Sequence, residues 1–157
     1  MTIIERLDQP SRYVERNLRR QGHMEDLDKL AQSKTIYVGN LSFFTTEAQI
    51  RQLFALAGRV QQVIMGLDRF EKTPCGFCFV EYSTRDGALD CLKYISGTKL
   101  DDRIIRADMD LGFVPGREFG RGRSGGQMRD EARLEYDQAR GGFGRRDDRE
   151  KEREAEE

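Results

Sequence analysis

Residues 73–82 constrain the fold more than any other part of the chain. The aromatic and β-branched residues in this stretch are typical of a β-strand, in which successive side chains point to opposite faces. Phe77 and Phe79 therefore share one face, whereas Cys78 and Val80 share the other. Because a half-buried sheet packs one face against helices, the phenylalanine pair is left to form an aromatic platform. Platforms of this kind stack nucleic-acid bases.

The same stretch matches the signature of RNA-binding strands, [KR]-G-[FY]-[GA]-F-V-x-[FY]. Residues 75–82 read C-G-F-C-F-V-E-Y and fit six of the seven specified positions when Cys78 is accepted as a small residue. Cys75 replaces the basic residue at the first position, so one usual phosphate contact is absent. We expect an RNA-binding strand whose affinity comes mainly from stacking and hydrogen bonds.

The distribution of charge agrees with a small contribution from phosphates. The 157 residues carry a formal net charge of −1, which is unusual for a protein that binds nucleic acid by its phosphates. The only basic window is residues 111–146, with 8 basic and 5 acidic side chains, whereas residues 147–157 carry 3 basic and 7 acidic ones. Three cysteines favour a reducing compartment over a disulfide framework. No secretory signal, membrane span or catalytic set is apparent.

The order of predicted elements is that of a ferredoxin-like α+β fold. Strands are expected at residues 35–41, 60–67, 73–82 and 103–109, with helices after Thr46, after Ser83 or Thr84, and at residues 26–32. Thr46 and Gln49 fit a capping box. The β-α-β-β-α-β order, with aromatic residues on the first and third strands, describes an RNA-recognition-motif domain.

This domain is assigned to residues 34–110, after an N-terminal extension at residues 1–33. A glycine- and arginine-rich extension follows at residues 111–144, and a charged tail that we expect to be disordered covers residues 145–157. Nine of the 16 glycines fall between residues 112 and 144. Composition alone predicts a flexible linker here, with an Arg-Gly-Gly sequence at residues 140–142.

Three aromatic side chains are expected on one face of the sheet. Alternation places Ile36 and Val38 toward the helices and Tyr37 on the side of Phe77 and Phe79. A stacked base typically contributes ~1–3 kcal/mol. The alternative is that a partner protein covers this face.

The spacing of Cys75 and Cys78 resembles half of a zinc or redox site, but residues i and i+3 of a strand lie on opposite faces. No second pair completes four zinc ligands. We therefore expect Cys78 in the core, and neither a metal nor a cofactor.

The last predicted strand places charges beside the aromatic face. Arg106, Asp108 and Asp110 share one parity along it. One interpretation is a solvated strand end. The other is a guanine-reading site, because a carboxylate accepts hydrogen bonds from N1–H and N2–H₂ of guanine, at ~1.5–3 kcal/mol for each charge-assisted bond. A negatively charged site also favours a base that itself carries positive charge.

Residues 11–144 resemble the small subunits of nuclear cap-binding complexes. The resemblance is carried by YVGNLSF at residues 37–43, MGLD at 65–68, CGFCFVEY at 75–82, LDDRIIR at 100–106, and GR, GRG and GGQ at 116–117, 120–122 and 125–127. Ordinary RNA-recognition domains do not carry the last three motifs. The resemblance implies binding of the 7-methylguanosine 5′ cap of RNA polymerase II transcripts.

The same resemblance implies the residues of the cap site. Tyr37 stacks on one side of the methylated base and Tyr13 on the other, with cation–π character from the positive charge of the base. Phe77 and Phe79 support the site. The guanine-reading segment is Arg106, Asp108, Met109 and Asp110, and the residues near the triphosphate are Arg117, Arg121, Gln127, Met128 and Arg129.

Two residues depart from the family pattern. Met109 stands where the family usually has tryptophan, and Ala132 stands where it usually has tyrosine. A role carried by the backbone tolerates Met109 with some loss of packing. Ala132 removes a ring and a hydroxyl group near the phosphates.

The family also implies a partner and a location. Its members pair with a large helical subunit in the nucleus, in a complex that serves splicing, RNA export and nonsense-mediated decay. The helical face is the expected contact surface, and shuttling to the cytoplasm stays open. Two other interpretations remain: a general single-stranded RNA-binding protein of splicing or RNP type, and a protein-interaction domain.

Overall fold

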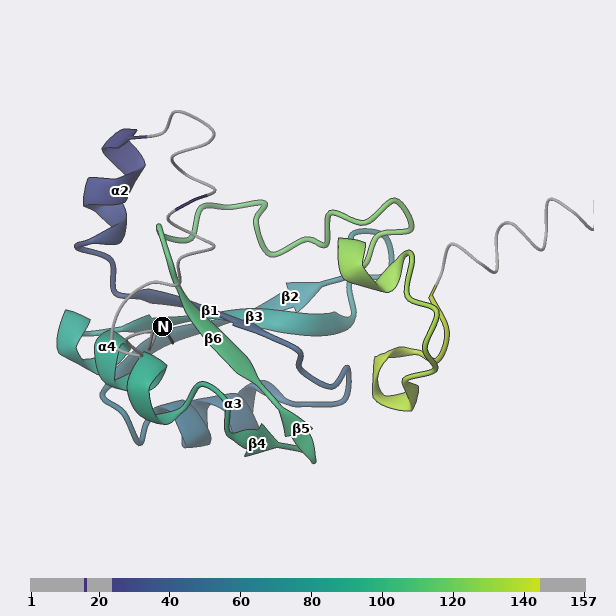
Figure 1. Cartoon of the computed structure of the whole chain (residues 1–157), viewed down its shortest axis with the longest axis horizontal. Helices are drawn as coiled ribbons and strands as arrows, with labels where there is room; N and C mark the ends of the chain where they lie inside the picture. The colour runs from purple at the N-terminus through teal and green to yellow at the C-terminus, as the bar shows by residue number, and fades with distance from the viewer. Residues whose placement is uncertain (1–15, 17–23, 145–157) are drawn as a thin grey trace, which may run out of the picture.

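The computed structural model describes Arg16 and residues 24–144 (Figure 1). In chain order the elements are α2 (Met24–Leu30), β1 (Thr35–Gly39), α3 (Glu47–Phe54), β2 (Val60–Leu67), β3 (Pro74–Tyr82), α4 (Arg85–Tyr94), β4 (Lys99–Leu100), β5 (Arg103–Ile104), β6 (Arg106–Asp110) and the 3₁₀ helices η1 (Met128–Asp130) and η2 (Gln138–Arg140). Tyr13 lies outside the described residues, as does the tail after residue 144. None of the described helices is long and apolar enough to cross a membrane.

Four antiparallel strands form the main sheet in the order β2-β3-β1-β6. The first and third predicted strands, β1 and β3, lie side by side at its centre, as the ferredoxin-like order requires. Their register places Ile36 opposite Val80 and Tyr37 opposite Phe79. The α+β fold predicted from the sequence is confirmed.

The last predicted strand, residues 103–109, is divided in the structure. β5 pairs with β4 in a small two-stranded sheet, and only β6 joins the main sheet. Asp101 and Asp102 form the connecting turn with φ values of 50° and 62°. Two central residues of positive φ are what a tight hairpin turn requires, and aspartate tolerates this conformation. The alternation of side chains did not reveal the hairpin. Ile105, between β5 and β6, is buried and so continues the alternation from one strand to the next.

The main core lies between one face of the sheet and the helices α3 and α4 (Figure 1). Cys78 and Val80 are fully buried in it, which confirms the assignment of Cys78 to the core. The capping box of Thr46 and Gln49 begins α3 as predicted. Because the helices cover this face, the aromatic residues of β1 and β3 are left on the opposite one.

Residues 111–144 fold back along the face of the sheet that the helices leave open (Figure 1). The amide of Leu67 donates to the carbonyl of Glu118 at 2.7 Å, and the amide of Gly120 donates to the carbonyl of Leu67 at 2.8 Å. The extension thus forms an isolated parallel bridge between Phe119 and Leu67, at the end of β2. Further along, the amide of Phe43 donates to the carbonyl of Ala139 at 2.8 Å.

The prediction of a flexible linker was therefore wrong for residues 111–144. Arg140, which belongs to the Arg-Gly-Gly sequence of that predicted linker, is 2% exposed. Several glycines of this extension allow close packing, whereas an added Cβ at Gly112 or Gly116 would meet nothing within 4 Å. A Cβ on Gly120 or Gly122 would collide with the carbonyl oxygen of Gly126.

Candidate nucleic-acid interface

Three aromatic rings from the two central strands form the floor of a cavity on the face opposite the helices. The rings of Tyr37 and Phe77 are stacked, with centroids 5.9 Å apart and an interplanar angle of 29°. Phe79 meets both rings edge-on, at 5.8 Å and 6.0 Å. The predicted placement of all three rings on one face is confirmed.

The two phenylalanines are more enclosed than the open platform that the sequence predicts. Phe77 is 5% exposed and Phe79 is 3% exposed. The Phe113 ring packs on Phe79 at 5.6 Å, and the guanidinium group of Arg117 lies 4.9 Å from the centre of the same ring. Tyr37 stays only half-buried. It is therefore the ring of the three that a ligand reaches most readily.

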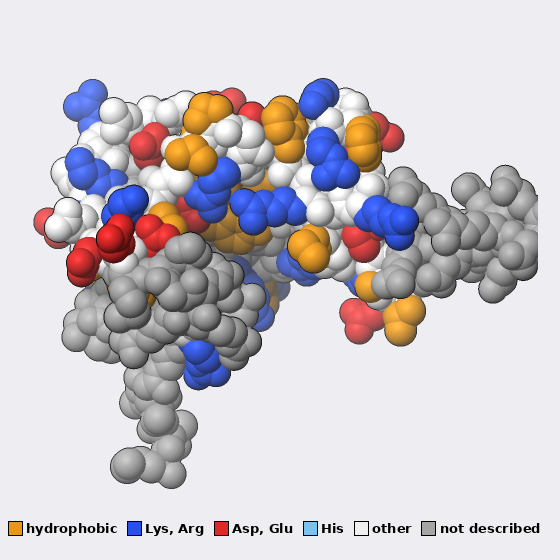
Figure 2. Space-filling model, turned by 90° about the horizontal axis from the view of Figure 1, so that it is seen from above, with side chains coloured by type: hydrophobic (Ala, Val, Ile, Leu, Met, Phe, Trp, Pro, Cys, Tyr) orange, Lys and Arg blue, Asp and Glu red, His pale blue; other side chains and the backbone are white. Residues whose placement is uncertain are grey.

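The cavity above these rings has a volume of about 340 Å³. It is lined by Tyr37, Phe77, Phe79, Arg117, Phe119, Gly120, Arg121, Gln127, Met128 and Arg129. We call residues 117–129 the wall segment. Small-ligand pockets range over about 300–1,000 Å³, so this cavity is in the size range of a site for one small ligand. Figure 2 shows Lys and Arg side chains gathered around a hollow with hydrophobic side chains inside it.

The hydroxyl group of Tyr37 joins the floor of the cavity to the wall segment. It accepts a hydrogen bond of 2.7 Å from Nε2 of Gln127. Burial raises the pKa of Tyr37, although this hydrogen bond acts in the opposite direction. The side chain is therefore a neutral phenol at physiological pH, and its ring face can attract a cation.

Strand β6 brings its charged residues to the edge of the aromatic face. In the register, Asp108 lies opposite Tyr37, and Arg106 and Asp110 share its parity as predicted. Met109 points the other way and is 1% exposed within the core. A ligand on the aromatic face can therefore contact only the backbone of Met109.

Asp110 and Arg117 form a salt bridge. Two hydrogen bonds of 2.6 Å and 2.8 Å join the carboxylate to the guanidinium, which also donates to the carbonyl of Gly112 at 2.6 Å. Hydrogen bonding to Asp110 raises the pKa of Arg117 above its ordinary value. The sequence assigned one of these residues to guanine and the other to the triphosphate. In the structure they form one unit that places a guanidinium over Phe79.

The remaining predicted residues lie on the exposed side of the cavity. Arg121, Met128 and Arg129 are exposed, Met128 at 69%. Arg129 also donates to the side-chain oxygen of Asn40 at 3.2 Å. Two guanidinium groups at the cavity rim provide donors for phosphate oxygens.

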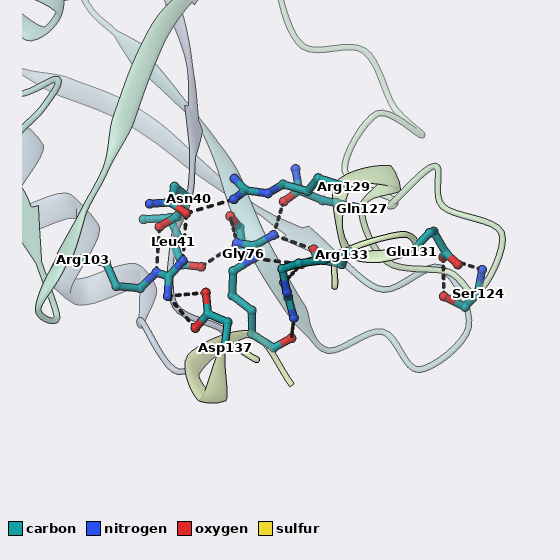
Figure 3. A network of polar contacts seen from close by, with 12 residues as sticks. Asn40, Leu41, Gly76, Arg103, Ser124, Gln127, Arg129, Glu131, Arg133 and Asp137 are labelled. Carbon is teal, nitrogen blue, oxygen red and sulfur yellow. Dashed lines mark hydrogen bonds and ion pairs between the residues drawn. The ribbon is translucent and has the colours of Figure 1, made fainter. Parts of the chain in front are cut away.

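Sequence reasoning missed the residues that anchor the wall segment. Asn40 follows β1 with a φ of 61°, and its side-chain oxygen accepts from Arg103 at 2.8 Å. Arg103 also binds both carboxylate oxygens of Asp137, at 2.7 Å and 2.8 Å (Figure 3). A signal was present, since Phe113 and Phe119 are atypical of a glycine-rich linker.

Comparison with known proteins agrees with this geometry. The model of the RNA recognition motif matches residues 36–106. Nuclear cap-binding protein subunit 2 from Ixodes scapularis is 66% identical over 113 residues, which cover 72% of this chain and 74% of that protein. This chain belongs to the nuclear cap-binding protein subunit 2 family.

Two further relatives carry the same name. The protein from Schizosaccharomyces pombe is 57% identical over 91% of this chain and 78% of its own length. The protein from Danio rerio is 57% identical over 80% of this chain and 81% of its own length. Among solved structures, RNA binding protein PG1 is 26% identical over 52% of this chain and 99% of that chain, with a TM-score of 0.49. The family is one of RNA-binding proteins rather than of enzymes.

Proposed function

We propose that this chain binds the 7-methylguanosine 5′ cap of RNA polymerase II transcripts, as the small subunit of a nuclear cap-binding complex. The observation that carries the proposal is the cavity over Tyr37, with its aromatic floor and its arginine-bearing wall segment. Methylation at N7 gives the guanine ring a positive charge, so an electron-rich ring stacks on it more strongly than on plain guanine.

Guanine is read by β6 in this proposal. The carboxylate of Asp108 lies beside Tyr37 by register and accepts from the N1–H and N2–H₂ groups of the base. Asp110 contributes through its Oδ1 atom, which can accept a hydrogen bond from the base in addition to the one from Arg117. Its Oδ2 accepts from both Arg117 and Gly112, whereas Oδ1 accepts one hydrogen bond from Arg117 and keeps a second lone pair. The backbone at Arg106 and Met109 supplies further hydrogen-bonding groups, and the Met109 amide, which donates to Oδ1 of Asp108 at 2.8 Å, exchanges that partner for the base.

The triphosphate lies along the wall segment in this proposal. Arg121 and Arg129 line the cavity and are exposed, so their guanidinium groups reach phosphate oxygens without losing buried partners. Arg117 contributes charge and fewer hydrogen bonds, because three of its five N–H donors are engaged with Asp110 and Gly112. Tyr13 is proposed as the second stacking ring, from the N-terminal extension.

Binding of capped and uncapped RNA tests this function. Two transcripts of one sequence, one with a methylated cap and one with a 5′ triphosphate, are titrated against the chain and its Tyr37→Ala variant. We expect preference for the capped transcript, which the variant loses. Equal binding of both transcripts, with a steep dependence on salt, would instead indicate a general single-stranded RNA-binding protein. No binding of either transcript would indicate a protein-interaction domain.

We further propose a heterodimer with a large helical subunit that contacts the side of the sheet covered by α3 and α4. Leu56 and Tyr94 are 78% and 61% exposed there. Pull-down of the separately purified large subunit by this chain, with Leu56→Glu as the disruptive variant, tests the surface. The variant is expected to lose the partner and to keep its fold. Retention of the partner by this variant would place the contact elsewhere.

The partner is also proposed to raise cap affinity by ordering the N-terminal extension around Tyr13 before the cap binds. Such ordering removes an entropic cost from the binding step. Cap affinity measured with and without the large subunit tests this idea, and equal affinities contradict it. Nuclear location, shuttling to the cytoplasm, and roles in splicing, RNA export and nonsense-mediated decay complete the proposal.

A further inference from the structure

Arg140 is one of the few fully buried charged groups in the part of the chain that the structure describes. Its side chain is 0% exposed. A guanidinium group has five N–H donors and no acceptor, and five hydrogen bonds leave Arg140. The acceptors lie on Asp130 and on Leu41, Gly76 and Gln127, which Figure 3 labels. A lysine at this position has three donors and cannot satisfy the same set.

We propose that Arg140 is a positioning residue for the cap site, acting on the Tyr37 hydroxyl through the side-chain amide of Gln127. This inference deepens the function proposed above and rests on it for its effect on cap affinity. Its structural part, the orientation of Gln127 against Tyr37, can be tested without any ligand.

Two backbone carbonyls fix one end of the guanidinium to the domain. Nη1 of Arg140 donates to Leu41 at 2.8 Å and to Gly76 at 3.1 Å. Leu41 follows β1, which carries Tyr37, and Gly76 lies in β3, which carries Phe77 and Phe79. The guanidinium is thus placed by the same two strands that form the cavity floor.

Asp130 neutralises the buried charge from the side of the wall segment. Its carboxylate accepts from Nε of Arg140 at 3.0 Å and from Nη2 at 2.6 Å. Arg133 also donates to Asp130, and to the carbonyls of Arg140 and Gly142. Arg133 and Arg140 therefore both bind the carboxylate of Asp130. Arg133 has no hydrogen bond to Gln127, which makes it a matched control.

The donor-only chemistry of Arg140 sets the orientation of Gln127. Nη2 of Arg140 donates to Oε1 of Gln127 at 2.6 Å. Because an amide has one oxygen and one NH₂ group, binding the oxygen turns the NH₂ group away. Nε2 then donates to the Tyr37 hydroxyl at 2.7 Å. The alternative flip would set the NH₂ group against a guanidinium with no acceptor. Arg140 therefore decides which end of Gln127 meets Tyr37.

A double-mutant cycle on Arg140→Lys and Gln127→Ala tests the proposal. Affinity for a methylated cap dinucleotide is measured for the full chain, for both single variants and for the double variant. Arg140→Lys is expected to weaken binding about tenfold, the change that one hydrogen bond of typical strength produces. In the Gln127→Ala background, Arg140→Lys should not weaken binding further, because the side-chain amide through which Arg140 acts is absent. Equal losses in both backgrounds, or no loss in either, would overturn the proposal.

A spectroscopic signal separates failure of this proposal from failure of cap binding. The Cζ resonance of Tyr37, assigned with Tyr37→Phe in ¹³C-tyrosine-labelled protein without ligand, reports the hydrogen bond to its hydroxyl. The chemical shift of this resonance should change in Gln127→Ala and in Arg140→Lys, and should be unchanged in Arg133→Lys. The Tyr82 resonance is the folding control, because its hydroxyl donates to the carbonyl of Phe54 in the core. An unmoved Tyr37 resonance in folded Arg140→Lys overturns the proposal whether or not the chain binds caps.

Discussion

Gly76 has no room for a side chain, and Gly76→Ala therefore tests how firmly the C-terminal extension is anchored. Its φ is 92°. A Cβ there would lie 2.7 Å from Cζ of Arg140 and 2.9 Å from the carbonyl oxygen of Leu41. The Leu41 carbonyl is itself an acceptor for the Arg140 guanidinium. The substitution must move the buried guanidinium, the backbone, or both.

Two costs contribute to the loss of stability in Gly76→Ala. Alanine at a positive φ is strained by ~1–3 kcal/mol. Displacing the guanidinium breaks the hydrogen bonds from Nη1 to Leu41 and Gly76, each worth ~1.5–3 kcal/mol because the donor is charged. We expect the free energy of unfolding to fall by at least ~4 kcal/mol, the sum of the two lower limits.

Urea unfolding followed by circular dichroism measures this loss, with the slope of the transition as a check on two-state behaviour. Gly97→Ala is the matched control, because Gly97 has a φ of 84° and no atom within 4 Å of an added Cβ. It should cost only the backbone strain, ~1–3 kcal/mol. If Gly76→Ala costs no more than Gly97→Ala, the guanidinium is not fixed beside Gly76 and the account of the anchor is wrong.

Three other predictions concern the cap site and the core. Tyr37→Ala should weaken binding of a methylated cap dinucleotide by ~1–3 kcal/mol in a calorimetric titration, and unchanged affinity would remove Tyr37 from the site. Arg121→Ala should weaken binding of the triphosphate-bearing analogue more than that of the nucleoside, whereas equal losses would contradict its phosphate role. Burial raises the pKa of Cys91 from 9.0 to about 12. Because the unfolded thiol ionises first, the free energy of unfolding should fall as pH rises above 9.0, and less steeply in Cys91→Ala.

Local patterns were sufficient for the strands that form the cavity floor. Alternation along residues 35–41 and 73–82 identified both central strands and the face of each side chain, because one face of the sheet is buried and a shift of one residue would invert it. The same parity argument placed Asp108 on the face of the aromatic residues, where the register sets it opposite Tyr37. These inferences needed no knowledge of the rest of the chain.

The walls of the cavity could not be predicted in this way. Arg140 binds Leu41 across 99 positions of sequence, and Gln127 binds Tyr37 across 90. No local periodicity encodes contacts of that range, and a glycine-rich composition is ambiguous. Glycine permits disorder, but it also permits the close backbone approach seen at Gly76. The enclosure of Phe79 by Phe113 and Arg117 escaped prediction for the same reason.

The most direct test of the cap-binding account is a fluorescence titration of the full chain with a methylated cap dinucleotide and its unmethylated twin. The two ligands differ by one methyl group and one positive charge, so their difference in affinity reports how strongly the stacking rings and the carboxylates of β6 favour a cationic base. The account predicts methyl-dependent quenching and tighter binding of the methylated ligand, by at least ~1 kcal/mol in a partly desolvated site. Equal affinity for the two ligands would contradict it.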